Sequence, residues 1–393
     1  MLVGLVGKPS AGKSTFFKAA TLAEVEIASY PFTTIKANHG VGYVKVECIE
    51  EEFGVKCNPN HGFCIRGKRF VPVDLMDVAG LVPGASEGKG LGNKFLDDLR
   101  QADVFIHIVD ASGTTDVTGK QTTGYDPCND VIFLEDELNK WFFDIMIKVW
   151  KGFARKAESE NLNFSEAVAK QFSGLKVKED DVKDVLLKLN LAKKPSQWNN
   201  DEIMNFSSEL RKHCKPMIIA ANKCDCKEAQ QNIKKMQDKF SQYMIYPCSA
   251  DSELALREAS KTGLIEYIPG EKNFRIIGKL NDKQKEALEK IKSDVLDIYG
   301  GTGVQEVLNL AVFEFLKYIA VFPAGASKLA DSKGNILPDC FLLPPKSTSL
   351  DFAYFLHTDF GKNFIKAIDI RTKKALGKSY VLKHRDALEI VTK

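Results

Sequence analysis

The first fifteen residues constrain the fold of this chain more than any other stretch. Met1–Val6 is a short apolar run whose Val and Leu content is typical of a buried parallel strand. Residues 7–14 follow it directly, read GKPSAGKS and match G-x-x-x-x-G-K-[ST], and a helix is predicted from Thr15 onward. In this order, successive backbone N–H groups and the positive end of the helix surround one anion. The stretch therefore predicts an α/β fold with a site for nucleotide phosphates.

Within this phosphate-binding loop (P-loop), individual residue types suit separate tasks. The two glycines let the backbone turn closely around the anion. The Lys13 ammonium can reach the β- and γ-phosphates, and the Ser14 hydroxyl can ligate Mg²⁺. We expect the nucleotide to lie against the whole loop, that is, against Gly7, Lys8, Pro9, Ser10, Ala11, Gly12, Lys13, Ser14 and Thr15.

A second motif follows an apolar strand predicted over Phe70–Met76, the later of two strands of which the first covers Gly42–Cys48. Residues 77–80 read DVAG and match D-x-x-G. Asp77 is placed to support Mg²⁺ through a bound water, and the Gly80 N–H to face the γ-phosphate.

The polar connection at residues 29–35 is where a threonine must reach both Mg²⁺ and the γ-phosphate. Thr34 is the predicted residue and its neighbour Thr33 the alternative. Thr34, Lys13 and Gly80 are then the expected catalytic set, and Ser14, Thr34 and Asp77 the expected metal set.

The base is predicted by Asn222-Lys223-Cys224-Asp225, which follows a buried apolar run at residues 216–221 and matches N-K-x-D. A carboxylate at Asp225 accepts from both N1–H and the exocyclic amine of guanine, whereas adenine would leave it unpaired. Asn222 is expected to contact the base edge and the Lys223 stem to cover the ring. A backbone N–H at Ser249-Ala250 is expected to meet guanine O6.

Three stretches together resemble the Obg superfamily of GTPases, nearest its YchF-like branch: the P-loop, YPFTTI at residues 30–35 and DVAGLVPGASEGKGLGNKFL at residues 77–96. The resemblance implies GTP or GDP as the ligand, Mg²⁺ as the cofactor and a switch in the glycine-rich residues 84–92. Leu81 stands where other switches carry a glutamine, which implies slow intrinsic hydrolysis. Ser10 stands where many relatives have an asparagine linked to potassium-assisted hydrolysis, so potassium dependence stays open.

The pattern along the chain predicts a P-loop GTPase domain, a mostly parallel sheet flanked by helices, over residues 1–127 and 214–319. Helical periodicity with dense charge predicts a helical insertion at residues 128–213. Residues 320–393 combine short strands with a helix, including residues 350–356 and 387–391, and resemble the TGS domain, a β-grasp module. His107, inside the apolar strand predicted at residues 103–110, is expected to be a core histidine.

Charge and composition restrict the partners. Residues 320–393 contain twelve Lys and Arg against seven Asp and Glu, a balance of +5, so the rest of this +3 chain carries −2. A basic C-terminal domain favours RNA, and the resemblance implies a ribosome or a related RNA–protein particle. No uncharged apolar run reaches membrane length, and the strand predicted at Met1 leaves no room for a signal peptide. We therefore expect a cytoplasmic protein without membrane contact.

Nine cysteines, an odd number spread over the chain, predict reduced thiols. Cys48, Cys57, His61 and Cys64 are close in sequence and allow three states: a Zn²⁺ site, a Cys57–Cys64 disulfide if the source is an extreme thermophile, or free thiols, which are the default.

Taken together, these patterns predict a GTP-hydrolysing switch acting on a ribosome or another RNA–protein particle. Two alternatives are an ATP-preferring YchF-like regulatory ATPase and a nucleotide-gated protein-binding scaffold without RNA contact.

Overall fold

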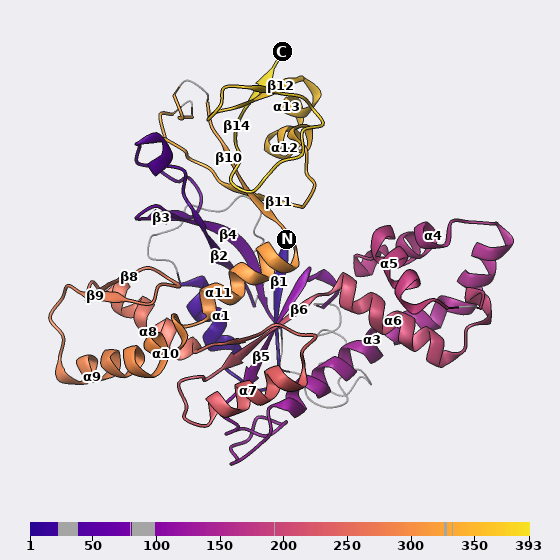
Figure 1. The fold of residues 1–393 in the computed structure, drawn as a ribbon, viewed down its shortest axis with the longest axis horizontal. Coiled ribbons are helices and arrows are strands. Elements are labelled where there is room, and N and C mark those ends of the chain that lie inside the picture. The colour runs from indigo at the N-terminus through magenta and orange to yellow at the C-terminus, as the bar shows by residue number, and fades with distance from the viewer. Residues whose placement is uncertain (23–37, 79, 81–98, 192, 326–327, 332) are drawn as a thin grey trace.

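The computed structural model describes residues 1–22, 38–78, 80, 99–191, 193–325, 328–331 and 333–393 (Figure 1). Its main sheet has the strand order β2-β4-β1-β5-β6-β7, with β3 added on β4. Strands β4, β1, β5, β6 and β7 run parallel, while β2 and β3 are antiparallel to β4. These strands are β1 Leu2–Val6, β2 His39–Glu47, β3 Phe63–Ile65, β4 Lys68–Asp77, β5 Val104–Asp110, β6 Met217–Asn222 and β7 Ile245–Pro247. The predicted mostly parallel α/β sheet is confirmed.

Strands β5 and β6 are buried along their whole length, as expected for parallel strands covered on both faces. Residues along β5 alternate between the two faces, so that Ile106 enters the core beneath α1 (Lys13–Thr21) and Phe105 enters the core beneath α3 (Cys128–Ser159). Helices α1 and α11 (Val304–Asn309) thus cover one face, and α3 and α7 (Ala229–Lys239) cover the other.

The carboxyl ends of the parallel strands meet at one edge of the sheet. Leu5 of β1 pairs with Asp77 of β4, and Asp110 of β5 pairs with Asn222 of β6. Ligands of open α/β sheets bind at this edge, so the register alone brings the three sequence motifs together.

A helical segment lies between β5 and β6 and projects away from the sheet (Figure 1). Its aromatic side chains form a core in which the rings of Trp150 and Trp198 stack with centroids 5.4 Å apart. The helices are α3, α4 Phe164–Gln171, α5 Glu179–Leu189 and α6 Asn200–Cys214, with single 3₁₀ turns at Ser173–Leu175 and Pro195–Gln197.

The chain returns to the sheet through α8 (Ala250–Lys261) and a small lobe. Gly303 lies so close to β7 that an added Cβ would stand 2.0 Å from the Pro247 oxygen, which only glycine permits. The lobe contains β8 Ile265–Tyr267, β9 Phe274–Ile276, α9 Asp282–Ile291, a π-helical stretch Lys292–Leu296 and α10 Asp297–Tyr299, followed by α11 and a second π-helical stretch Leu310–Phe315.

The C-terminal residues form a second sheet, with the order β11-β10-β14-β12-β13. Of the two segments singled out in the sequence, residues 350–356 belong to a helix and residues 387–391 to a strand. The helix begins with a capping box between Thr348 and Asp351. The elements are β10 Ile319–Pro323, β11 Phe341–Leu343, α12 Ser349–Leu356, α13 Thr358–Lys362, β12 Phe364–Asp369, β13 Ala375–Leu376 and β14 Ala387–Thr392. Among the described helices, none has the length and apolar character needed to cross a membrane.

Candidate nucleotide-binding site

The P-loop connects β1 to α1 and leaves room for no side chain at its two glycines. A Cβ at Gly7 would lie 2.4 Å from the Ile108 oxygen, and one at Gly12 would lie 2.1 Å from Asn222 Nδ2. Gly12 also has a φ of 95°, in the left-handed region, immediately before α1 begins at Lys13. The loop is therefore held against both β5 and the end of β6, with the first turn of α1 at its centre.

Lys13 lies over this loop with its ammonium confined. Its side chain is 8% exposed, and Nζ donates to the Lys8 carbonyl at 3.1 Å. Burial lowers the pKa of Lys13, and the nearby charge of Asp77 opposes that shift. The D-x-x-G glycine is close by, since a Cβ at Gly80 would lie 3.3 Å from Nζ. Lys13 and Gly80 are thus brought together as the sequence predicted.

Ser14 and Asp77 offer oxygen atoms suited to Mg²⁺. Ser14 Oγ donates to Asp77 Oδ2 at 2.9 Å, and Asp77 Oδ1 is buried without a hydrogen-bond partner among the described residues. A hydroxyl and an unsatisfied carboxylate oxygen beside the P-loop match the hard-oxygen preference of this ion. The predicted Thr34, its alternative Thr33, Leu81 and residues 84–92 lie outside the described residues.

The guanine motif and the Ser249-Ala250 turn lie together at the end of β6. Ser249 Oγ donates to Asp225 Oδ1 at 2.7 Å, which fixes the orientation of this carboxylate. A cavity of about 230 Å³ opens beside it, lined on one side by Asp225, Asp251 and Ser252 and on the other by residues of α9 and the π-helical stretch, including Lys290 and Asp294. This second wall could not be predicted from the sequence, because its residues belong to no motif.

Asn222 connects two loops of the site. Its Nδ2 donates to the Ala11 carbonyl at 2.9 Å, and its Oδ1 accepts the Ala250 N–H at 3.0 Å. The side chain therefore joins the P-loop to the Ser249-Ala250 turn, and its expected contact with the base edge stays a prediction. The Ser249 N–H also has a protein acceptor, the Thr302 carbonyl at 2.8 Å. Among the described residues, Asp251 is the first residue at this end of α8 whose backbone N–H has no acceptor in the protein.

Lys223 is held by a carboxylate that the sequence analysis missed. Its Nζ forms a 2.8 Å ion pair with Asp110 Oδ2 at the end of β5. Burial alone would raise the pKa of Asp110, but hydrogen bonds from Lys223, Ser112 and Thr115 outweigh it and hold that pKa below its usual value. This role could have been inferred from the sequence, because Asp110 is an acidic residue at the end of an apolar strand. The ion pair fixes the Lys223 ammonium at the end of β5, and the expected cover of the base by its stem stays a prediction.

The Lys8 side chain is bound within the protein. Its side chain is buried, forms a 2.9 Å ion pair with Asp130 of α3, donates to the Thr115 carbonyl at 2.7 Å and lies over the Tyr125 ring. The pair fastens the P-loop to α3 and the loop that precedes it.

Lys8→Met is expected to lower the free energy of unfolding by about 3 kcal/mol, because it leaves the buried Asp130 carboxylate without its cation. Urea unfolding followed by circular dichroism measures the change. Adding Asp130→Leu to Lys8→Met should restore most of the loss, and the exposed Lys18→Met serves as the control. Equal stability of Lys8→Met and the parent would show that the ion pair does not hold the loop.

His107 lies beneath the P-loop as a core residue. It is 1% exposed, and burial lowers its pKa to about 3, with the charges of Lys13 and Lys8 adding to the effect. The ring is thus neutral at physiological pH, which confirms the expectation of a core histidine.

Three motifs lie at the carboxyl edge of the sheet: the P-loop with its lysine and serine, the D-x-x-G carboxylate beside them, and the N-K-x-D carboxylate at the end of β6. Together they define a GTP-binding protein of the P-loop class. Three family models match the chain: "50S ribosome-binding GTPase" over residues 2–137, "Obg-like GTPase YGR210-like, G4 motif-containing domain" over residues 220–325, and "TGS domain" over residues 327–392.

Similar proteins extend over the whole chain. An uncharacterized GTP-binding protein of Methanocaldococcus jannaschii is 48% identical, covering 100% of this chain and 99% of its own length. A GTP-binding protein of Pyrococcus horikoshii has a solved structure with a TM-score of 0.79 at 40% identity, each chain covered completely. The ribosome-binding ATPase YchF of Bacillus subtilis is 27% identical, covering 93% of this chain and 87% of its own. The chain belongs to the YchF-like GTP-binding proteins of the Obg superfamily and ends in a TGS domain.

Proposed function

We propose that this protein hydrolyses GTP to GDP and phosphate with Mg²⁺ and acts as a nucleotide-dependent switch on the ribosome. The observation that carries the choice of GTP is the Asp225 carboxylate, which Ser249 holds and which lines a cavity. Asn222 ties the Ser249-Ala250 turn, which holds Asp225, to the P-loop, which supports one nucleotide reaching both motifs.

The reaction would be attack of water on the γ-phosphate. Lys13 and the P-loop N–H groups stabilise the negative charge that develops on the phosphate oxygens, and the limited exposure of Lys13 keeps its field from being screened by solvent. Mg²⁺ held by Ser14, with Thr34 and Asp77 as further support, would neutralise charge on the β- and γ-phosphates. Gly80 is placed to donate its N–H to the γ-phosphate. A leucine at position 81 gives the attacking water no hydrogen bond, so we expect slow intrinsic turnover.

The ribosome is proposed from the relatives and from the C-terminal domain. YchF relatives carry the name ribosome-binding ATPase, and a family model described as a ribosome-binding GTPase matches the N-terminal part. Lys374, Lys378 and Lys383 of the C-terminal domain are exposed and available for phosphates of RNA. We propose the division into residues 1–127 with 214–319, 128–213 and 320–393 as the GTPase domain, the helical insertion and the docking domain.

Replacing Lys374, Lys378 and Lys383 together by Gln is expected to weaken ribosome association about tenfold at physiological salt and to make it less steeply salt-dependent, because fewer phosphate counterions are released. Co-sedimentation with ribosomes, in the presence of a non-hydrolysable GTP analogue or GDP, measures the effect. GTP affinity should not change, since these lysines lie outside the nucleotide motifs.

Three exposed lysines of the helical segment, Lys148, Lys151 and Lys170, provide a charge-matched control. Ribosome binding that is insensitive to the C-terminal change, or absent with both nucleotides, would overturn the docking role. Tighter binding of ATP than of GTP would favour the ATPase alternative.

A further inference from the structure

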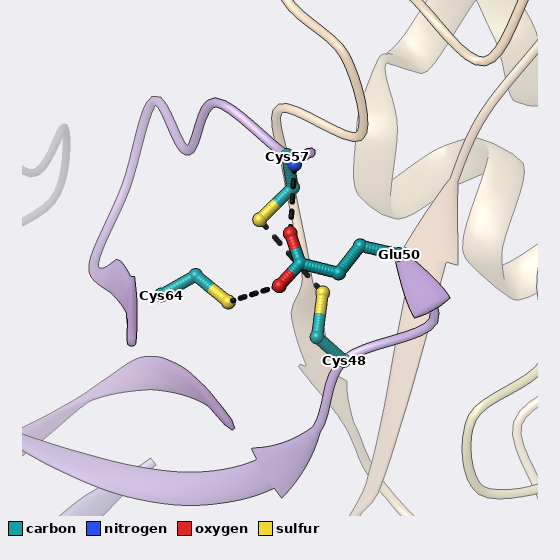
Figure 2. A group of neighbouring side chains, drawn as sticks. All are labelled: Cys48, Glu50, Cys57 and Cys64. Atoms are coloured by element: carbon teal, nitrogen blue, oxygen red, sulfur yellow. Dashed lines mark hydrogen bonds between the residues drawn. The ribbon is translucent and has the colours of Figure 1, made fainter. Parts of the chain in front are cut away.

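Four potential metal ligands converge near the loop between β2 and β3. Cys48 follows β2, Cys57 lies in the loop and Cys64 is in β3, and their side chains point toward the Glu50 carboxylate (Figure 2). One ligand atom from each lies within 4.8 Å of the others. His61, which the sequence placed in this set, does not belong to it, and Glu50 takes its place.

The spacing of these atoms suits a small tetrahedral ion. Cys48 Sγ and Cys57 Sγ are 3.8 Å apart, and Cys64 Sγ is 3.4 Å from Glu50 Oε1. Two thiolates bound to one Zn²⁺ at about 2.3 Å in tetrahedral geometry lie about 3.8 Å apart. The two sulfurs are also too far apart to be bonded to each other, since a disulfide spans about 2.05 Å.

The charge around the cluster also fits an anionic ligand set. Arg69 is 0% exposed, and its Nη1 lies 3.7 Å from Cys57 Sγ. Among the described residues no carboxylate forms an ion pair with this guanidinium, although the charge of Arg69 does act on Asp339 nearby. A buried cation is stabilised by further negative charge. Three thiolates and a carboxylate around a divalent ion carry a net charge of −2, which the arginine would partly balance.

We propose that Cys48, Cys57, Cys64 and Glu50 bind one Zn²⁺ ion. Three soft sulfur ligands favour Zn²⁺ over Mg²⁺ or Ca²⁺, and four protein ligands leave no open position, as in structural zinc sites. Binding displaces the thiol protons to solvent, including the one that Cys64 now shares with Glu50.

The position of the site indicates what the ion would stabilise. The loop that carries Cys57 binds the C-terminal part of the chain through Asn58 N–H to the Ile336 carbonyl and Asn60 N–H to the Pro338 carbonyl, both 2.8 Å. Arg69 Nη2 donates to the Leu337 carbonyl at 2.7 Å. Zinc would therefore fix a loop of the GTPase domain in the shape that receives the C-terminal domain.

The test uses the full-length protein purified without chelator. Elemental analysis should find about one Zn²⁺ per chain. After removal of zinc, Co²⁺ titration should give the thiolate charge-transfer band and the visible d–d bands of tetrahedral sulfur coordination. Cys64→Ser and Cys57→Ser should lose zinc, Glu50→Gln should bind it about tenfold more weakly or worse, and Cys214→Ser, a buried cysteine far from the cluster, should retain it.

A second readout separates zinc binding from the GTPase reaction. Zinc should protect the junction at residues 335–340 from limited proteolysis in the parent protein and in Cys214→Ser, but not in Cys64→Ser. If the purified parent protein contains no zinc and gives no cobalt–thiolate absorption, the proposal is overturned, even if every variant unfolds. Thiol titration that finds two of the three cysteines oxidised would overturn it equally.

Discussion

Asp225→Asn is expected to weaken GTP binding about thirtyfold and to admit xanthine nucleotides. The carboxylate accepts from two guanine donors, and replacing one charge-assisted interaction with an unfavourable amide contact costs about 2 kcal/mol. Xanthine presents an oxygen where guanine has its amine, so the new amide can donate to it. Equilibrium titration with fluorescent GTP, XTP and ATP analogues measures all three affinities.

The substitution should preserve the local structure, because the asparagine oxygen can still accept the hydrogen bond from Ser249 Oγ. Asp238→Asn, an exposed change of equal charge on α7, is the matched control. If the parent protein binds ATP and GTP equally, or if Asp225→Asn keeps its preference for guanine, the assignment of Asp225 to the base is wrong.

Lys13→Ala is expected to lower the rate of GTP hydrolysis by about 10²–10³-fold. This is the effect of removing one preorganised donor from a developing negative charge in a site with little solvent. Because the Lys13 side chain is nearly buried, a water molecule that enters its place cannot stabilise the phosphate charge as well as the ammonium does. Single-turnover release of phosphate under saturating Mg²⁺ gives the rate, and GDP affinity should fall less than GTP affinity because the γ-phosphate is absent.

Lys18→Ala, on the exposed side of the same helix, controls for the loss of a positive charge. A hydrolysis rate within threefold of the parent in Lys13→Ala would show that another cation supports the γ-phosphate. The urea midpoint should remain near that of the parent, because the only described hydrogen bond of Lys13 Nζ is to the Lys8 carbonyl.

Local sequence was sufficient for the motifs whose residues are contiguous. The P-loop depends on its glycines, because any other residue would be strained there or would clash with its neighbours. A Cβ at Gly12, for example, would lie 2.1 Å from Asn222 Nδ2. The strand that ends at Asn222 was equally clear, because fully buried parallel strands give continuous apolar runs. The roles of Thr34 and Leu81 remain predictions, since both lie outside the described residues.

The sequence by itself determined the α/β class and located the P-loop and the N-K-x-D motif, because each depends on neighbours in the chain. Only the tertiary structure decided which distant side chains complete them. The Lys8 side chain packs against α3 because Asp130 binds it, and Asn222 joins two loops because the sheet brings the carboxyl ends of β1, β6 and β7 to one edge. Glu50, and not His61, joins the three cysteines because the loop between β2 and β3 folds back on itself. Pairings of this kind are set by packing across the sheet, and no spacing along the chain records them.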